Sequence, residues 1–307
     1  MTAPHVPVLL EAVVESFAAV QPGWVVDCTI GYAGHSDALL SRYNTIGILG
    51  IDRDPTALDF SRQRLKTYGE RVRLYRGDFA SQIAQLDAEP ITGILADFGV
   101  SSLQLDRPER GFRFDSERLD MRMDPDAPLD AYTVVNHYTT DRLSRLLRDY
   151  GEIRAATRLA EAITTERARA PIETAQQLSA LAERVLGARR GKIHPATQLF
   201  QAIRIEVNDE LGQIETLLDA LERMRPSGAV VTLITFHSLE DRLVKRRFRQ
   251  WARACICDPQ APRCTCGGDH QLGTIPLRKP ITATPDEVRT NPRSRSARLR
   301  SFRFKEF

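Results

Sequence analysis

The 307-residue chain lacks any apolar run close to the ~20 residues that a membrane-spanning helix needs. Its first 20 residues contain no basic segment followed by an apolar stretch, which argues against a secretory leader. Cysteine is scarce, with five residues in the chain, and a cytosolic protein is not expected to join them in disulfides. Internal repeats are absent as well. These absences predict a soluble, cytoplasmic protein. A length of 307 residues allows a large core and about two domains.

Net charge is small, but the charges are unevenly distributed. The whole chain carries +3, whereas residues 238–307 hold 16 Lys and Arg against 7 Asp and Glu, a charge of +9, and the remainder carries −6. The basic excess is either a solvated face or a surface for RNA phosphates, since clustered cations gain affinity for a polyanion by releasing its counterions. Along a predicted final strand four arginines alternate and would share one face: Arg293, Arg295, Arg298 and Arg300. The alternative is that they pair with acids such as Glu240 and Asp241.

Short apolar runs alternate with helical patterns in the first third of the chain. The runs predict strands at residues 24–28, 46–52, 72–75 and 91–97, and the helical patterns between them cover residues 37–43, 55–68 and 81–86. Close alternation of this kind is typical of parallel strands covered by helices.

The alternation stops after residue 104. A loop rich in Arg, Asp and Pro follows at 106–128, and then come helical patterns at 140–149, 155–170, 175–186 and 195–207. It resumes with a helix at 209–224, a strand at 229–236 and a basic helix from Leu239. We therefore predict an α/β sheet interrupted by an all-helical insert. One discontinuous domain comprises residues 1–104 and 208–307, and the insert comprises 105–207.

The turn after the first predicted strand has the residues of a nucleotide-binding βαβ unit. In VDCTIGYAGHS (residues 26–36), Gly31 and Gly34 allow close approach of a ligand. Asp52 lies about 20 residues beyond the first glycine, where its carboxylate can accept both hydroxyls of an adenosine ribose. The turn lacks the third glycine of a dinucleotide site. S-adenosylmethionine, an adenosine with a short amino-acid tail, therefore fits better than a dinucleotide.

Asp97 ends the fourth predicted strand in ILADFGVSSLQLD (residues 94–106). At the switch point of a doubly wound sheet, strand ends line the ligand crevice, so Asp97 is expected to face the glycine turn. Its carboxylate could accept the N–H of an amine. Alternatively, Asp97 only caps the following turn, a common use of aspartate.

Several long motifs together resemble the MraW family of bacterial S-adenosylmethionine-dependent methyltransferases, which modify the N4 amino group of a cytidine in the decoding region of 16S ribosomal RNA. The motifs are HVPVLLEAV (5–13), DCTIGYAGHS (27–36), IDRD (51–54), DFGVSSLQLDRPERGFRF (97–114), LDMRMD (119–124), HPATQLFQAIRIEVNDEL (194–211), TFHSLEDRLVKRRF (235–248) and NPRSRSARLR (291–300). The resemblance covers nearly the whole chain. It implies a class I (Rossmann-like) methyltransferase sheet with a helical domain inserted after the fourth strand.

Two positions depart from the family pattern. The family usually has Gly-Gly-His where this chain has Ala33-Gly34-His35, and Asp-Leu-Gly where it has Asp97-Phe98-Gly99. Ala33 adds one methyl group, and cofactor binding is expected to survive it if φ stays below zero there.

The resemblance implies cofactor contacts at Ala33, Gly34, His35, Asp52, Phe79, Asp97 and Gln104. Gly34 and His35 would open a helix whose N–H groups hold the methionine carboxylate. Phe79 would pack on adenine, although a lone phenylalanine after a strand is more often part of the core. Gln104 could also be a turn residue only.

Cysteine placement argues for an exocyclic amine as the methyl acceptor. Methylation of cytosine at C5 needs a covalent thiolate adduct, and no cysteine stands beside the expected substrate loop. An amine needs only orientation toward the sulfonium methyl, a role assigned to Asp97 with the carbonyls after it. The expected partner is 16S ribosomal RNA, in the small ribosomal subunit, and the residues expected to hold it are Asp120, Arg122, His194, Asn208, His237 and Ser238. For His194 and His237 a purely structural role is an open alternative.

The remaining four cysteines form a metal-like cluster, Cys255, Cys257, Cys264 and Cys266. Four thiolates suit tetrahedral zinc, but pairs separated by one residue are tighter than the usual spacing, and the implied reaction requires no metal. His270 is a fifth candidate ligand. The cluster is either a structural zinc site or a reduced, loosely ordered loop.

Two rival functions use parts of the same pattern. An NAD-dependent oxidoreductase would share the βαβ unit and Asp52, but it would normally show the complete glycine fingerprint. A non-catalytic RNA-binding module would explain the basic C-terminal segment, yet it leaves the glycine turn and Asp52 without a role.

Overall fold

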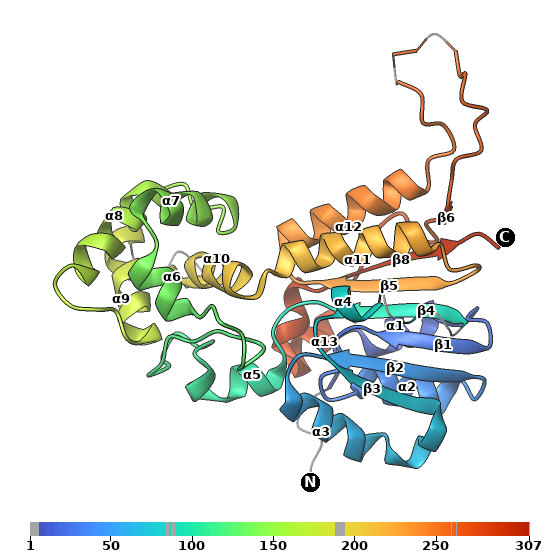
Figure 1. The fold of residues 1–307 in the computed structure, drawn as a ribbon, viewed down its shortest axis with the longest axis horizontal. Coiled ribbons are helices and arrows are strands. Elements are labelled where there is room, and N and C mark those ends of the chain that lie inside the picture. Colours follow the sequence, from blue (N-terminus) through green and yellow to red (C-terminus); the bar gives the residue numbers. More distant parts are fainter. Residues whose placement is uncertain are drawn as a thin grey trace. The chain divides into compact units, whose positions relative to one another are not determined.

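The computed structural model describes residues 6–83, 86, 90–187, 194–258, 260–261 and 263–306. The chain forms two compact units, Met1–Gly99 with Gly212–Phe307, and Val100–Leu211. In Figure 1 the first unit is blue at its N-terminal part and orange to red at its C-terminal part, and the second is green to yellow.

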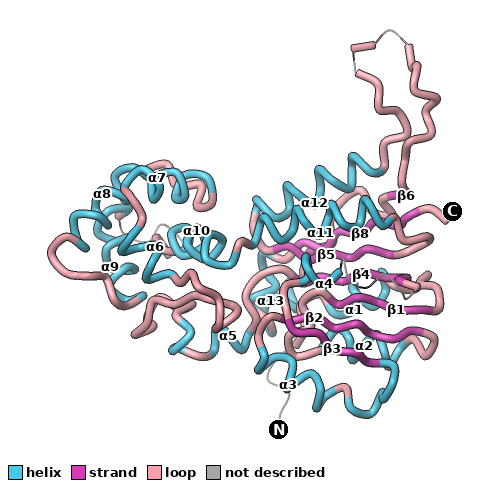
Figure 2. Tube along the Cα trace, viewed as in Figure 1, coloured by secondary structure: helices cyan, strands magenta, loops and turns pink. Residues whose placement is uncertain are grey.

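A single sheet organises the first unit. Five parallel strands lie in the order β3 (Val72–Arg76), β2 (Ile46–Asp52), β1 (Gly23–Asp27), β4 (Ile91–Asp97) and β5 (Val230–Thr235). Strand β8 (Arg298–Phe304) pairs antiparallel to β5, and the short strands β6 (Gly273–Thr274) and β7 (Ile281–Thr282) pair with β8 (Figure 2). All five strands predicted for the parallel sheet are confirmed within two residues at each end.

Helices cover both faces of this sheet. Neighbouring residues of each strand point to opposite faces, so each buried strand contributes side chains to two cores. Val26, Leu49 and Val231 pack in one core with α4 (Phe79–Ile83), α11 (Glu210–Met224) and α12 (Ser238–Trp251). Val25, Ile48 and Val230 pack in the other core with α1 (Leu10–Ser16), α2 (Gly34–Arg42) and α3 (Pro55–Arg64). The predicted α/β class, with a sheet wound on both sides, is confirmed.

Some helix boundaries differ from prediction. The pattern at 55–68 divides at Leu65 into α3 and a 3₁₀ segment, Lys66–Arg71. The helix expected at 81–86 begins earlier, at Phe79, and residues 84 and 85 lie outside the described part. The helices α1 and α13 (Pro285–Thr290) were not predicted.

The second unit is helical. It contains α5 (Ser102–Asp106), a 3₁₀ turn (Pro108–Arg110), α6 (Ala131–His137), α7 (Thr140–Asp149), α8 (Ala156–Arg167), α9 (Ala175–Leu186) and α10 (Thr197–Asn208). Fully buried leucines and isoleucines from α7, α8, α9 and α10 form its core, including Leu147, Leu159, Ile163, Leu178 and Ile203. Among the described residues of this unit there is no strand, as predicted.

The C-terminal arginines do not lie on one strand, so that prediction is wrong. Arg293 and Arg295 belong to a 3₁₀ turn, Pro292–Ser296, which Pro292 begins and in which Ser294 Oγ donates to Asn291 O. Only Arg298 and Arg300 share a face of β8, and both pair with Asp241 of α12, at 3.1 and 2.7 Å. The alternative pairing with Asp241 therefore holds for these two.

Candidate functional site

Three aspartates meet at one edge of the sheet. Strand β1 lies between β2 and β4 and runs parallel to both, so the carboxyl ends of these strands are neighbours. Each strand ends on an aspartate, Asp27, Asp52 and Asp97 respectively. The edge therefore gathers three carboxyl groups beside the turn that follows β1.

Asp52 holds the glycine turn. Its Oδ2 accepts the backbone N–H of Gly31 at 2.9 Å, and its Oδ1 accepts that of Asp54 at 2.9 Å. Burial raises the pKa of Asp52 to about 6, although both hydrogen bonds oppose the rise. The carboxylate thus organises the turn to which a ribose is expected to bind.

Asp27 is a site residue that the sequence reasoning did not single out. It is 2% exposed, its Oδ2 accepts Ser36 Oγ at 2.6 Å, and its Oδ1 accepts the N–H of Thr29 at 3.2 Å. Burial raises the pKa of Asp27 to about 6. The available signal was an acidic residue ending an apolar strand directly before a glycine turn.

Ala33 adopts a left-handed conformation, with φ 56° and ψ 27°, so the condition of a negative φ, under which cofactor binding was expected to survive the added methyl group, is not met. Its N–H donates to Ile30 O at 2.6 Å, and it is the N-cap of α2, so closure of the turn fixes this conformation. An L-residue in this region costs roughly 1–2 kcal/mol relative to the right-handed region. The chain keeps this strain at a position where the family that it resembles usually has glycine.

The N-terminal segment packs on the first residues of α2. A Cβ on Gly34 would lie 2.3 Å from Pro7 Cγ, so only glycine fits there. His35 is buried, and its Nε2 lies 2.9 Å from Val8 O. These contacts fix the start of the helix that is expected to hold an anionic group.

Asp97 lies against the same turn, as predicted. Its N–H donates to Thr29 Oγ1 at 2.7 Å, and its Oδ2 is 4.0 Å from His35 Nδ1. Burial, with the charges of Asp27 and Glu240, raises the pKa of Asp97 well above its usual range. Its side chain is 26% exposed, but Oδ1 is buried and has no hydrogen-bond partner among the described residues. An acceptor left in this state costs about 1–3 kcal/mol.

Phe79 and Gln104 have contacts of their own. Phe79 is buried in the sheet core, with its ring centroid 6.0 Å from that of Phe98. In the second unit, Gln104 is buried, and its Oε1 accepts the N–H of Ser101 in a capping box at the start of α5. A cofactor contact by either residue stays a prediction.

Three of the expected RNA residues hold one loop of the second unit. Arg122 forms two side-chain hydrogen bonds with Asp120, at 2.7 and 3.0 Å. Asn208 is buried, accepts the N–H of Met123 at 2.7 Å and donates to Met121 O at 2.8 Å. These residues therefore fix the loop LDMRMD, and a direct contact with RNA stays a prediction.

The two histidines also have protein partners. In the second unit, His194 Nε2 lies 2.7 Å from Glu183 Oε1, and its ring stacks on Phe114 at 4.5 Å. In the first unit, His237 is the N-cap of α12 and its Nδ1 accepts the N–H of Glu240. Ser238 follows as the exposed first residue of that helix. Both histidines thus have structural contacts within the protein, and a contact of either one with RNA stays a prediction.

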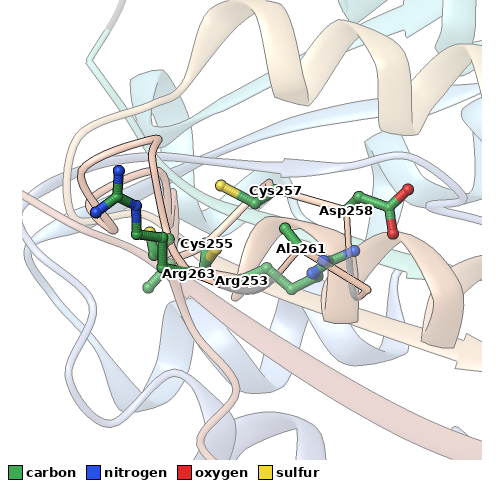
Figure 3. A pocket seen from close by; sticks show the side chains of 8 residues that line it. Arg253, Cys255, Cys257, Asp258, Ala261 and Arg263 are labelled. Carbon is green, nitrogen blue, oxygen red and sulfur yellow. Dashed lines mark hydrogen bonds between the residues drawn. The ribbon is translucent and has the colours of Figure 1, made fainter.

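The four clustered cysteines come together on the segment between α12 and β6. Their sulfur atoms all lie within 4.8 Å of one another. Figure 3 shows Cys255 and Cys257 at a surface pocket that Arg253, Arg263 and Asp258 also line. Donation by the N–H of Ile256 and of Gly268 lowers the pKa of Cys266 to about 5.

No helix in the described ranges is long and apolar enough to cross a membrane.

Comparison with known proteins identifies the family. The MraW methylase family matches residues 2–305. A protein of Sulfurovum sp. named ribosomal RNA small subunit methyltransferase H is 60% identical over 99% of both chains, and one of Nitratiruptor sp. with the same name is 55% identical over 100% of both.

Solved structures give weaker likenesses. A precorrin-6y C5,15-methyltransferase of Geobacter metallireducens has a TM-score of 0.42 at 9% identity, covering 97% of this chain and 88% of that one. An rRNA methylase of Streptococcus thermophilus has a TM-score of 0.38 at 12% identity, covering 97% and 94%. The family match spans nearly the entire sequence and the relatives align end to end, so the chain belongs to the MraW methylase family and is a methyltransferase.

Proposed function

We propose that the protein transfers a methyl group from S-adenosylmethionine to the N4 amino group of a cytidine in the decoding region of 16S ribosomal RNA, without a covalent enzyme adduct. The names of its full-length relatives support a small-subunit ribosomal RNA substrate. The observation that carries the chemistry is the carboxyl group of Asp97, which is partly exposed beside the glycine turn and whose Oδ1 has no donor among the described residues. An acceptor without a donor is suited to an amine N–H.

The residues of the sheet edge fit this cofactor. S-adenosylmethionine supplies, when bound, an electrophilic methyl group on a positively charged sulfur. Asp52 would accept the ribose hydroxyls, and the N-terminal N–H groups of α2 at Gly34 and His35 would hold the carboxylate. Ala33, Phe79, Asp97 and Gln104 complete the proposed contacts. Three carboxyl groups with pKa values raised by burial suit a cationic ligand, because its charge offsets their mutual repulsion.

Asp97 is the proposed catalytic residue. By accepting an N4 hydrogen with the exposed part of its carboxyl group, Asp97 would orient the nitrogen lone pair. A carboxyl group with a raised pKa is also a better base for the proton that the amine loses. Cys28 is buried beside this edge, and burial raises the pKa of its thiol well above the ordinary value. A poorly ionised thiol supports direct transfer rather than a covalent route.

Asp97→Asn tests this assignment. The variant keeps the shape and one acceptor oxygen, but it loses the charge and presents a donor to the amine. We expect the single-turnover rate to fall more than the affinity for S-adenosylmethionine, because the lost interaction acts during attack. The control is Asp59→Asn, an exposed acid on α3 that pairs with Arg62. A near-normal rate in Asp97→Asn would leave Asp97 with a structural role alone.

We further propose that residues 105–207 recognise the substrate, while residues 1–104 and 208–307 bind the cofactor. The basic C-terminal segment would contribute to RNA binding, and Lys245, Arg246 and Arg249 are exposed on α12. Neutralising Arg293 and Arg295 should weaken RNA binding and reduce its salt dependence by about one counterion per lost phosphate contact. Arg300→Gln is the matched control, because this arginine pairs with Asp241. Its loss should lower the melting temperature and leave the salt dependence of RNA binding unchanged.

The cellular reaction is tested by mass spectrometry of 16S ribosomal RNA from cells with and without the gene. Loss of a methyl group from one decoding-region cytidine supports the proposal, and an unchanged methylation pattern contradicts it. Failure of the purified protein to bind S-adenosylmethionine would favour an RNA-binding module without catalysis. Bound nicotinamide would favour an oxidoreductase.

A further inference from the structure

The segment between α12 and β6 extends from the end of a helix to a strand of the sheet, and its described residues form no hydrophobic core of their own. Figure 1 shows it as the orange excursion beyond the end of α12. Its base is closed by backbone hydrogen bonds from His270 N to Ala254 O at 2.9 Å and from Leu272 N to Trp251 O at 2.7 Å. None of the described residues between 254 and 270 is buried, and Ile256 is 61% exposed. Burial of apolar side chains therefore cannot order this segment, and small units of this kind usually need a covalent or metal link.

The sulfur atoms of the segment are spaced as ligands of one metal ion. The Sγ atoms of Cys255 and Cys264 are 3.6 Å apart, those of Cys264 and Cys266 are 3.6 Å apart, and those of Cys255 and Cys266 are 3.7 Å apart. A tetrahedral zinc ion with Zn–S bonds of about 2.3 Å has edges of about 3.8 Å between its sulfur ligands. A disulfide needs about 2 Å. The spacing of Cys255, Cys264 and Cys266 thus matches three ligands of one ion, and the Sγ atom of Cys257 lies within 4.8 Å of all three as the fourth.

Backbone donors explain how such tight cysteine pairs can form a site. The N–H of Ile256, between the first two cysteines, donates to Cys266 Sγ at 3.4 Å. The N–H of Thr265, between the other two, donates to Cys257 Sγ at 3.3 Å. Each pair therefore orients a ligand of the other pair, as outer hydrogen bonds do at metal sites. The one-residue spacing, which is tighter than usual, is accommodated by this reciprocal arrangement.

We propose that Cys255, Cys257, Cys264 and Cys266 bind one structural zinc ion that orders the segment from residue 254 to residue 270. Four protein thiolates close the coordination sphere, so the ion has no open position for catalysis. Mutual distances within 4.8 Å favour a single ion over a cluster of several irons, which separates its cysteines more widely. His270 lies outside the group, and its Nε2 is 2.8 Å from Cys266 O.

Metal analysis of the purified full-length protein tests the site. The protein is prepared under reducing conditions and supplied with zinc, and its metal content is measured by inductively coupled plasma mass spectrometry. We expect about one zinc ion per chain, and its loss in Cys255→Ser and in Cys264→Ser, which remove one ligand from each pair. His270→Ala, an exposed neighbour of the cluster, and Cys28→Ala, the cysteine outside it, should keep the ion.

Hydrogen exchange supplies a readout that depends neither on the reaction nor on the proposed RNA substrate. Removing zinc with a chelator should accelerate exchange of the amides between residues 254 and 270 and leave those of β4 and β5 protected. Absence of zinc from the reduced, zinc-supplied protein would overturn the proposal. So would stoichiometric iron with visible absorption, or full zinc content in both serine variants. Binding of S-adenosylmethionine is measured alongside, so failure of the proposed reaction is distinguished from failure of the metal site.

Discussion

Asp52→Ala tests two roles of this carboxylate, a proposed one in cofactor binding and an observed one in holding the glycine turn. In the proposed complex it accepts ribose hydroxyls, and in the protein alone it accepts the N–H groups of Gly31 and Asp54. A hydrogen bond to a charged group contributes roughly 1.5–3 kcal/mol, so affinity for S-adenosylmethionine should fall on the order of 10- to 150-fold. Asp52→Ala loses these two backbone contacts but also removes a carboxylate whose charged form burial disfavours, so the two effects partly cancel and the free energy of unfolding should change by no more than about 1–2 kcal/mol.

The assay is calorimetric titration with S-adenosylmethionine, combined with urea unfolding of the same samples. The pH is kept well above 6, because the pKa of Asp52 is raised to about 6 and its ionised form is the better acceptor. Lowering the pH through this value should weaken binding by the wild type, and this change should shrink in Asp52→Asn. Asp59→Asn, which removes an exposed charge from the neighbouring helix, is the control for net charge.

Unchanged affinity in a folded Asp52→Ala protein would refute the assignment of the ribose to Asp52. If Asp52→Ala loses affinity only because it unfolds, the urea unfolding curve will show a lower free energy of unfolding. Asp52→Asn is then the variant to measure, since its remaining oxygen can still accept one of the two backbone N–H donors.

Three further predictions concern the turn, the helical unit and the buried acid. Ala33→Gly should raise the free energy of unfolding by about 1 kcal/mol, because glycine adopts the positive φ without strain; a decrease on urea unfolding would mean that packing of the methyl group outweighs the strain. Asn208→Ala should lower the free energy of unfolding by about 2–3 kcal/mol, since it leaves buried backbone groups of the loop LDMRMD without partners; an unchanged value would contradict the role given to this amide. Asp27→Asn should change the pH dependence of stability. The folded pKa of Asp27 is raised from 3.8 to about 6, so the folded state keeps a proton that the unfolded chain releases, and wild-type stability falls as pH rises across that window. The variant should therefore gain up to about 3 kcal/mol on the wild type between these two pH values, and parallel stability curves would contradict the shift.

Local patterns predicted the secondary structure well where periodicity was strong. The helix Thr140–Asp149 and the strands Ile46–Asp52 and Ile91–Asp97 have the boundaries expected from their apolar spacing. Prediction failed at the C-terminal arginines, because side-chain alternation alone does not reveal that Pro292 begins a helical turn there. The sign of φ at Ala33 could not be predicted either, because the handedness of the turn depends on closure from Ile30 rather than on the residue itself.

The sequence by itself determined the class of sheet, the helical insert, the glycine turn with Asp52 and the family, because each depends on periodicity or on motifs that are local in the chain. Only the tertiary structure decided which side chains already have partners. It shows that Asn208, Asp120 and Arg122 form hydrogen bonds within their own unit, and that Arg300 pairs with Asp241. It also shows that Asp97 keeps a buried oxygen to which no described residue donates. It also brings two cysteine pairs to metal-ligand distances. The physical reason is that hydrogen-bond satisfaction, burial and pKa depend on neighbours distant in the chain, and spacing along the sequence does not specify those neighbours.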